Sequence, residues 1–179
     1  MAETLEDLLQ RLNIKTWDLL LVGDGSGSRW EQPAGWACVA IERSRQQLGR
    51  ANDSGGGEQL RRKVFYGAVN DGTVNFAELM AYFAPLSWYA AKTEKFDGPL
   101  VLPREVHILT DSQYVQKMMT GRMPKTHAAF WLAYNIYNRL GFRLNWHWLP
   151  RNDIALNRYV DAISRKARLL LQNPGSVLI

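Results

Sequence analysis

Hydrophobic and polar residues alternate, or form short apolar runs, in five segments of the chain. The last of these segments alternates strictly, with Leu144, Trp146 and Trp148 on one face and Asn145 and His147 on the other. This period of two is typical of a strand whose faces meet different surroundings. The first segment is mostly apolar and predicts a buried strand. We predict strands at 17–22, 35–42, 62–69, 106–110 and 143–149.

Elsewhere apolar residues return every three or four positions, which predicts helices. Leu5, Leu8 and Leu12 have this spacing near the N-terminus. Pro85 lies inside the longest helical segment, where we expect it to kink the helix or end it early, because proline has no N–H and collides with the preceding turn. The predicted helices span 4–12, 74–91, 112–119, 127–140 and 156–171.

The order of these elements predicts an α/β fold. Three successive strands favour an antiparallel meander, and the later strands, each reached through a helix, favour parallel additions. We therefore expect one mixed five-stranded sheet with helices on both faces. The glycine-rich residues 23–28 are expected to end the first strand, and the polar stretch 43–59 to form an exposed loop. We divide the chain into an N-terminal helical extension at 1–15, one domain at 16–172 and a tail at 173–179.

Composition limits the class of protein. The chain has 179 residues, 46% of them hydrophobic, which is enough for one domain with a sizeable core. Its 22 Lys and Arg exceed its 17 Asp and Glu, so a net charge of +5 favours an anionic partner, nucleic acid first. We expect a monomer.

The single cysteine and the terminal sequence suggest a compartment. Cys38 alone excludes an intrachain disulfide framework and a thiolate cluster for zinc, and its apolar surroundings predict a buried, inert thiol without a disulfide-linked partner. No run approaches the roughly 18 apolar residues of a membrane span. The N-terminus is acidic and amphipathic, unlike a secretory signal. We expect a cytoplasmic protein without a membrane partner.

Four carboxylates stand where they can converge. Asp24 and Asp111 follow the first and fourth predicted strands, Glu78 lies near the start of the longest helix, and Asp161 lies on the last helix. Taken singly, Asp24 also fits a hairpin turn and Asp111 a helix N-cap. A cluster of four carboxylates needs a compensating charge, because repulsion and desolvation oppose it. Divalent ions that prefer hard oxygen ligands are the obvious compensation.

The order and context of these acids resemble the ribonuclease H family, in its single-domain type-1 form. The matching motifs are Asp-Gly-Ser at 24–26, Asn-x-x-Glu-Leu at 75–79, Thr-Asp-Ser-Gln-Tyr-Val at 110–115 and Asn-x-x-x-Asp at 157–161. The resemblance covers residues 19 to 167, and the third motif is the most specific. It implies that the domain at 16–172 has a ribonuclease H-like fold and is catalytic.

The resemblance also implies a reaction. Members of this family hydrolyse the RNA strand of RNA–DNA hybrids with two Mg²⁺ ions, for which Mn²⁺ can substitute, and leave a 5′-phosphate and a 3′-hydroxyl. By motif, Asp24 would bridge both ions, Asp161 would hold the ion that activates water, and Glu78 with Asp111 would hold the ion at the leaving oxygen.

Substrate-binding residues carry over from the same motifs. Asn75 and Gln113 match residues that contact the RNA strand, Thr73 matches a residue that grips a DNA phosphate, and Asn157 matches a neighbour of the metal site. Capping or turn roles remain open for the first three. The small residues beside the aspartates would let the phosphate backbone approach, and the predicted substrate-binding set is completed by Gly25, Ser26 and Ser112.

The chain departs from the family in one loop. Many members have a histidine before the last helix, whereas residues 148–153 here read Trp-Leu-Pro-Arg-Asn-Asp. Arg151 could bind phosphate in its place or be a surface cation. Two other functions stay open: a non-catalytic nucleic-acid-binding module of the same fold, and a DNA-directed nuclease of the superfold such as a resolvase or transposase core.

Overall fold

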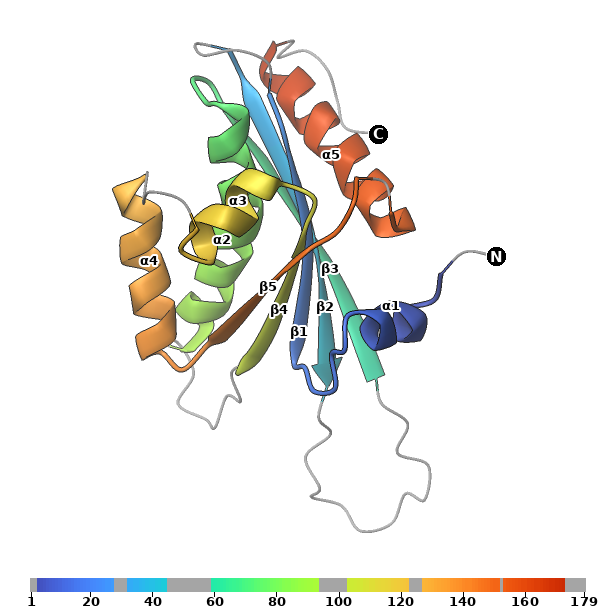
Figure 1. The fold of residues 1–179 in the computed structure, drawn as a ribbon. Helices are drawn as coiled ribbons and strands as arrows, with labels where there is room; N and C mark the ends of the chain where they lie inside the picture. Colours follow the sequence, from blue (N-terminus) through green and yellow to red (C-terminus); the bar gives the residue numbers. More distant parts are fainter. Residues whose placement is uncertain are drawn as a thin grey trace.

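One mixed sheet organises the molecule. The computed structural model describes residues 3–27, 32–44, 59–93, 103–122, 127–151 and 153–172. The strand order is β3-β2-β1-β4-β5; β1, β2 and β3 are antiparallel, and β4 and β5 run parallel to β1 (Figure 1). This confirms the predicted α/β class and the meander with two parallel additions. The strands are β1 Leu19–Ser26, β2 Ala34–Ser44, β3 Gln59–Val69, β4 Glu105–Thr110 and β5 Arg143–Trp148.

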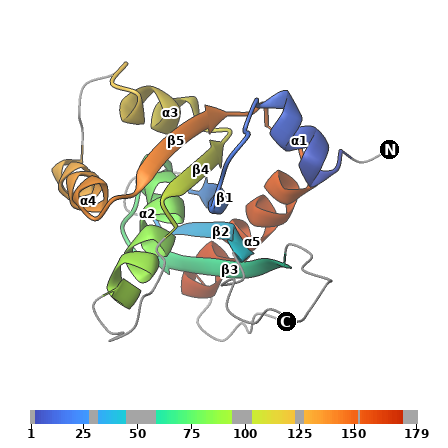
Figure 2. The ribbon, with the colours of Figure 1, turned by 90° about the horizontal axis from the view of Figure 1, so that it is seen from below.

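Helices cover both faces of the sheet, as predicted. The view along the strands places α2, α3 and α4 on one side and α1 and α5 on the other (Figure 2). Side chains alternate along the buried strand β1. Leu19 and Leu21 pack into the core on the side of α2, which we call the first core, and Leu20 and Val22 pack into the core on the side of α1 and α5, which we call the second core. The helices are α1 Leu5–Arg11, α2 Val74–Thr93, α3 Gln113–Met119, α4 Ala128–Arg139 and α5 Ala155–Gln172.

The helix α1 belongs to the second core. Its residue Leu8 is buried there, together with Ile14 and Trp17 from the segment that leads into β1. A capping box between Thr4 and Asp7 starts the helix. The Arg11 guanidinium pairs with a carboxylate beyond β5, that of Asp153. Residues on both sides of position 15 therefore pack into one core.

Two sequence features do not end their elements as expected. The strand β1 does not end at Gly23 but pairs with β2 as far as Ser26, so the glycines lie within the sheet. The helix α2 does not end at Pro85 and continues to Thr93. Beyond the proline, Leu86 and Tyr89 are buried in the first core, and burial of these large side chains offsets the lost hydrogen bond.

The polar stretch at 43–59 is only partly a loop. The strands β2 and β3 extend into it from both ends and pair as far as Ser44 and Gln59, and its remaining residues lie outside the described part of the chain. The predicted tail at 173–179 also lies outside the described residues.

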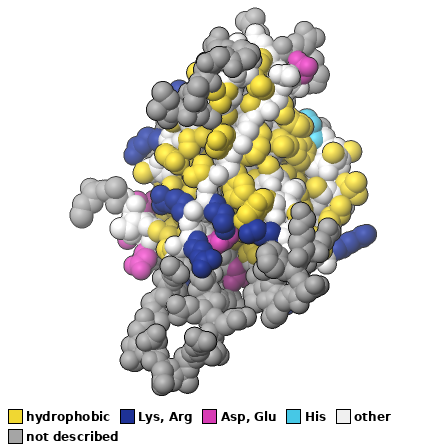
Figure 3. All heavy atoms as spheres, turned by 180° about the vertical axis from the view of Figure 1, so that it is seen from behind, with side chains coloured by type: hydrophobic (Ala, Val, Ile, Leu, Met, Phe, Trp, Pro, Cys, Tyr) yellow, Lys and Arg dark blue, Asp and Glu magenta, His cyan; other side chains and the backbone are white. Residues whose placement is uncertain are grey.

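The face on the β3 side is partly apolar. Seen from behind, hydrophobic side chains occupy the middle of this face and a group of Lys and Arg lies below them (Figure 3). On β3, the large exposed hydrophobic side chains are Leu60, Val64 and Tyr66. None of the described helices is both long and apolar enough to cross a membrane. The thiol of Cys38 is buried on β2, as predicted, and burial raises its pKa.

Candidate active site

Asp24 lies inside the sheet, near the end of β1. It pairs with Ala37 of β2, so the alternative reading of Asp24 as a turn residue is wrong. The next residue must be glycine, because a Cβ on Gly25 would lie 2.3 Å from the backbone nitrogen of Glu78. Backbone thus packs directly on backbone, and this close approach brings the start of α2 against β1.

Asp111 follows β4 and does not cap the next helix. The N-cap of α3 is Ser112, whose hydroxyl accepts a hydrogen bond from the Val115 backbone N–H at 3.3 Å. The N-cap reading of Asp111 is therefore wrong, because the neighbouring serine performs that role. The Asp111 carboxylate is left to face the end of β1.

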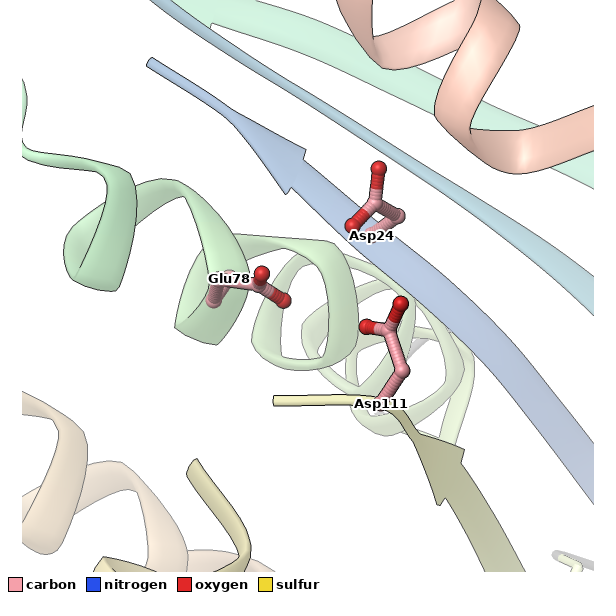
Figure 4. A group of neighbouring side chains, drawn as sticks. All are labelled: Asp24, Glu78 and Asp111. Carbon is pink, nitrogen blue, oxygen red and sulfur yellow. The ribbon is translucent and has the colours of Figure 1, made fainter. Parts of the chain in front are cut away.

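The three carboxylates of Asp24, Glu78 and Asp111 form one cluster, which we call the acidic triad. Each offers one oxygen, and these oxygens all lie within 4.8 Å of one another. They come from β1, from α2 and from the residue that follows β4, and they face a common space (Figure 4). Asp24 is 4% exposed and Glu78 8% exposed, whereas Asp111 is half-buried. Parallel strands that end side by side form a crevice at which α/β proteins commonly bind ligands.

Burial and mutual repulsion shift the proton affinity of the acidic triad. Desolvation first, then the charges of Asp111 and Asp161, raise the pKa of Asp24 to about 7. The pKa of Glu78 is raised well above its usual value, mainly by desolvation and then by the two aspartates, and a backbone hydrogen bond from Gly25 opposes the shift. Desolvation also raises the pKa of Asp111. A cation bound here would relieve all three shifts.

The acidic triad fits a divalent metal ion. All three ligands are carboxylate oxygens, the donors that Mg²⁺ and Mn²⁺ prefer. The Glu78 Oε2 atom is buried and has no hydrogen-bond partner among the described residues. Since a buried, unpartnered carboxylate oxygen is costly, an ion would supply the missing interaction. The chemistry of these residues therefore suits a metal ion at the acidic triad.

Asp161 borders the acidic triad without belonging to it. The Arg165 guanidinium, one turn further along α5, donates from Nε to Asp161 Oδ1 at 3.0 Å and from Nη2 to Oδ2. Ser164 connects the two parts of the site: its hydroxyl lies 3.2 Å from Asp24 Oδ2 and 3.0 Å from the Asp161 carbonyl oxygen. Asp161 is thus adjacent to the cluster but already paired.

Arg151 spans the gap between the two aspartates. Its Nε atom lies 3.9 Å from Asp111 Oδ2, and its Nη2 atom lies 3.7 Å from Asp161 Oδ1. These are long ion pairs, and the side chain is 67% exposed. Its positive charge lowers the pKa of each residue of the acidic triad, although desolvation outweighs this effect. The arginine predicted to bind phosphate therefore stands at the mouth of the site.

The other predicted substrate-binding residues lie around the same edge of the sheet. Thr73 is occupied as a cap, because its Oγ1 accepts from the Phe76 N–H at 3.1 Å. Asn75 is half-buried, and Gln113 is exposed with its Oε1 3.5 Å from the Lys117 Nζ. Ser26 ends β1 and is nearly buried. Asn157 is buried one turn before Asp161, and its Oδ1 has no partner among the described residues.

Three residues at or beside the site were not found from the sequence. They are Arg165, Ser164 and Tyr82, and the Tyr82 hydroxyl oxygen lies 2.8 Å from the carbonyl oxygen of Gly23, the residue before Asp24. Arg165 had a signal, because an acid and an arginine four positions apart on a helix form an ion pair. Ser164 and Tyr82 had none. A buried serine and a buried tyrosine in a helix look like ordinary core residues until the strand that they contact is known.

No family model and no curated protein matches the chain. Several solved structures match it over most of its length. The N-terminal RNase H domain of a Mycobacterium tuberculosis protein is 21% identical with a TM-score of 0.61, over 90% of this chain and 100% of that one. LC11-RNase H1 from compost, in complex with an RNA/DNA hybrid, is 16% identical with a TM-score of 0.61, over 87% and 99%.

An archaeal enzyme has the same architecture. RNase H1 from Halobacterium salinarum is 22% identical with a TM-score of 0.53, over 83% of this chain and 96% of that one. All three are similar along nearly their whole length, and identities at this level establish architecture without establishing activity. The chain therefore has the ribonuclease H fold.

Proposed function

We propose that this protein is a metal-dependent endoribonuclease that hydrolyses the RNA strand of RNA–DNA hybrids, leaving a 5′-phosphate and a 3′-hydroxyl. The observation that carries the proposal is the acidic triad: three carboxylates whose oxygens lie within 4.8 Å, at the ends of β1 and β4 in a ribonuclease H fold. A fold alone leaves the chemistry open, whereas burial raises the pKa of Asp24 and Asp111, and the cluster that they form with Glu78 is suited to a divalent cation.

Asp24, Glu78 and Asp111 would hold a divalent ion, and Asp161 would complete a second position with Asp24. Such ions supply the positive charge that polarises a phosphodiester and lowers the pKa of water. Ser164 would fix the position of Asp24 relative to Asp161 through its contacts with the Asp24 side chain and the Asp161 backbone. Arg151 is placed to pair with a phosphate at the mouth of the site, since its present ion pairs are long.

The hybrid is the substrate that the remaining residues favour. Asn75 and Gln113 offer amide groups near the acidic triad, and amides can hydrogen-bond to 2′-hydroxyls and base edges, the contacts that separate RNA from DNA. The net charge of +5 favours a polyanion. The hybrid bound by LC11-RNase H1 is consistent with the same substrate class here.

Substrate cleavage tests the proposal directly. End-labelled RNA–DNA hybrid, double-stranded RNA and double-stranded DNA are incubated with the protein in Mg²⁺, Mn²⁺ or EDTA. We expect cleavage of the hybrid alone, in either metal and not in EDTA, and loss of cleavage in Asp111→Asn. The matched control is Asp7→Asn, which neutralises an exposed aspartate of α1 outside the site.

Other outcomes would favour the alternatives. Binding of all three duplexes without cleavage, whatever the metal, would indicate a non-catalytic binding module. Cleavage of double-stranded DNA would indicate a DNA-directed nuclease. An Asp111→Asn variant as active as Asp7→Asn would remove the acidic triad from the reaction.

A further inference from the structure

Tyr82 lies beneath the acidic triad. It is fully buried on α2, one turn after Glu78. Its hydroxyl oxygen lies 2.8 Å from the carbonyl oxygen of Gly23, the residue before Asp24, and 3.1 Å from the carbonyl oxygen of Leu109 on β4. Leu109 lies two positions before Asp111 in the chain. One hydroxyl thus touches the backbone close to both aspartates.

The hydroxyl sits where the strands β1 and β4 separate. Their pairing ends at Val22 and Leu109, after which β1 continues along β2 while β4 ends at Thr110. The Gly23 carbonyl lies one residue beyond the last pair of β1 and β4, and a buried carbonyl group needs a hydrogen-bond donor. The Tyr82 hydroxyl can donate its hydrogen to either carbonyl and so takes the place of the next rung.

The chain leaves space for this ring. A Cβ on Gly23 would lie 2.7 Å from Cε1 of Tyr82, so glycine is needed for the ring to reach the strand ends. On β5, the Trp146 ring meets the tyrosine edge to face at 5.6 Å. Tyr82 therefore contacts β1, β4 and β5, so a shift of its side chain would move the strands against which it packs.

We infer that Tyr82 is a positioning residue, whose hydroxyl sets the separation of Asp24 and Asp111 and ties both to the helix that carries Glu78. The inference rests on the proposed metal-dependent function. Some residues orient the metal ligands without binding the metal themselves. Their removal typically weakens metal affinity by about 10-fold to 100-fold. Loss of the hydroxyl should therefore weaken Mg²⁺ binding while the ring continues to fill the core.

The test compares two Tyr→Phe variants. Tyr82→Phe removes the hydroxyl below the acidic triad. Tyr137→Phe is the matched control: it also removes a buried hydroxyl from the first core, 2.6 Å from Ser87 Oγ and 3.4 Å from the Phe83 carbonyl, and touches neither β1 nor β4 through that group. Mg²⁺ is titrated into each folded protein by calorimetry, and hybrid cleavage is measured against Mg²⁺ concentration.

We expect Tyr82→Phe to raise the Mg²⁺ dissociation constant about tenfold, to shift half-maximal cleavage to higher Mg²⁺, and to recover most of its cleavage rate at saturation. Tyr137→Phe should match the wild type in both measurements. Gly23→Ala, which crowds the ring without removing the hydroxyl, should weaken Mg²⁺ binding in the same direction.

Wild-type Mg²⁺ affinity in Tyr82→Phe, or an equal loss in both Tyr→Phe variants, would overturn the positioning role while leaving the proposed function intact. A poorly folded Tyr82→Phe protein leaves Gly23→Ala as the deciding variant, and wild-type affinity there would also overturn it. A wild-type protein that neither binds Mg²⁺ nor cleaves the hybrid would contradict the proposed function itself, and with it the inference.

Discussion

The acidic triad and Asp161 differ in how their carboxylates are paired with positive charge. In the acidic triad, Asp24 and Glu78 are buried and Asp111 is half-buried. Among the described residues, the ion pair to the triad is a long one, from Arg151 Nε to Asp111 Oδ2 at 3.9 Å. Asp161 is paired directly with the Arg165 guanidinium, whereas burial, followed by the charges of Asp111 and Asp161, raises the pKa of Asp24 to about 7. Within one site, Asp161 therefore has a close cationic partner, whereas the acidic triad has only a distant one among the described residues.

The difference indicates an order of metal binding. Bringing carboxylates together without a partner costs stability, and a cation that joins them recovers it. Asp161 has already gained that interaction from Arg165, so a metal ion must compete with the guanidinium. We therefore expect the acidic triad to bind its ion first and more tightly, and Asp161 to contribute more weakly.

Neutralising Asp24 should have the largest effect, in opposite directions on activity and on stability. We expect Asp24→Asn to lower hybrid cleavage roughly 10³-fold or more, because this acid faces both parts of the site. Without metal, the same variant should melt at a higher temperature, since an amide is cheaper to bury than a carboxylate. For a chain of this size each kcal/mol corresponds to about 2–4 °C.

Cleavage assays and thermal melting in EDTA measure the two effects. Asp7→Asn is again the control, and it should leave cleavage unchanged. A lower melting temperature for Asp24→Asn in EDTA would contradict the view that the acidic triad is electrostatically strained.

The next largest effect concerns the pH dependence of stability, whose direction should reverse when metal is bound. The pKa of Asp24 is about 7 in the folded protein and near 3.8 when unfolded, so the unfolded chain loses this proton first. Asp24 should therefore destabilise the metal-free protein progressively as the pH rises from about 4 to about 7. With saturating Mg²⁺, which needs ionised ligands, stability should instead increase over this range.

The difference between wild type and Asp24→Asn isolates this contribution. The pKa of His147 is lowered to about 4, mainly by burial and then by the charge of His107, so its effect is to increase stability as the pH rises from about 4 to its unfolded value near 6.5. Both proteins share this opposing effect. Melting curves in EDTA and in Mg²⁺, at about pH 5 and about pH 8, give the comparison; parallel curves for the two proteins would exclude a raised Asp24 pKa.

Loss of Asp161 should have a smaller effect than loss of an acid from the triad. We expect Asp161→Asn to reduce hybrid cleavage roughly 10-fold to 100-fold, with the tighter Mg²⁺ affinity retained, because the ligands of that ion are elsewhere. Calorimetry beside the cleavage assay separates the two quantities. A loss as severe as that of Asp24→Asn, together with loss of the tight ion, would show that the four acids act as one unit.

The smallest effect is expected at Arg151. If it contacts one phosphate, Arg151→Gln should keep cleavage at low salt and reduce the slope of log affinity against log salt by about one. Arg143→Gln is the control, since this exposed arginine pairs with Glu105 at the opposite end of the sheet. Equal slopes for Arg151→Gln and the wild type would make Arg151 a surface cation.

The sequence patterns were most informative for the elements and least for their ends. Alternation and helical spacing located each strand and helix, because burial of apolar side chains repeats with the backbone period. The end of β1 was missed because Gly23 and Gly25 look like a turn, although both are required by close packing on Tyr82 and Glu78. The predicted helix at 74–91 is close to the observed Val74–Thr93, and the early end that Pro85 suggested does not occur because core burial beyond the proline outweighs the local penalty.

The sequence by itself determined the α/β class, the order of strands and helices along the chain and the identity of the acids, since these depend on periodicity and on side chains whose chemistry is intrinsic. Only the tertiary structure decided which acids converge. It placed Asp24, Glu78 and Asp111 together, paired Asp161 with Arg165, and put the Tyr82 hydroxyl beneath the triad. These are contacts between elements distant in the chain, and their distances follow from the packing of the whole fold rather than from local preference.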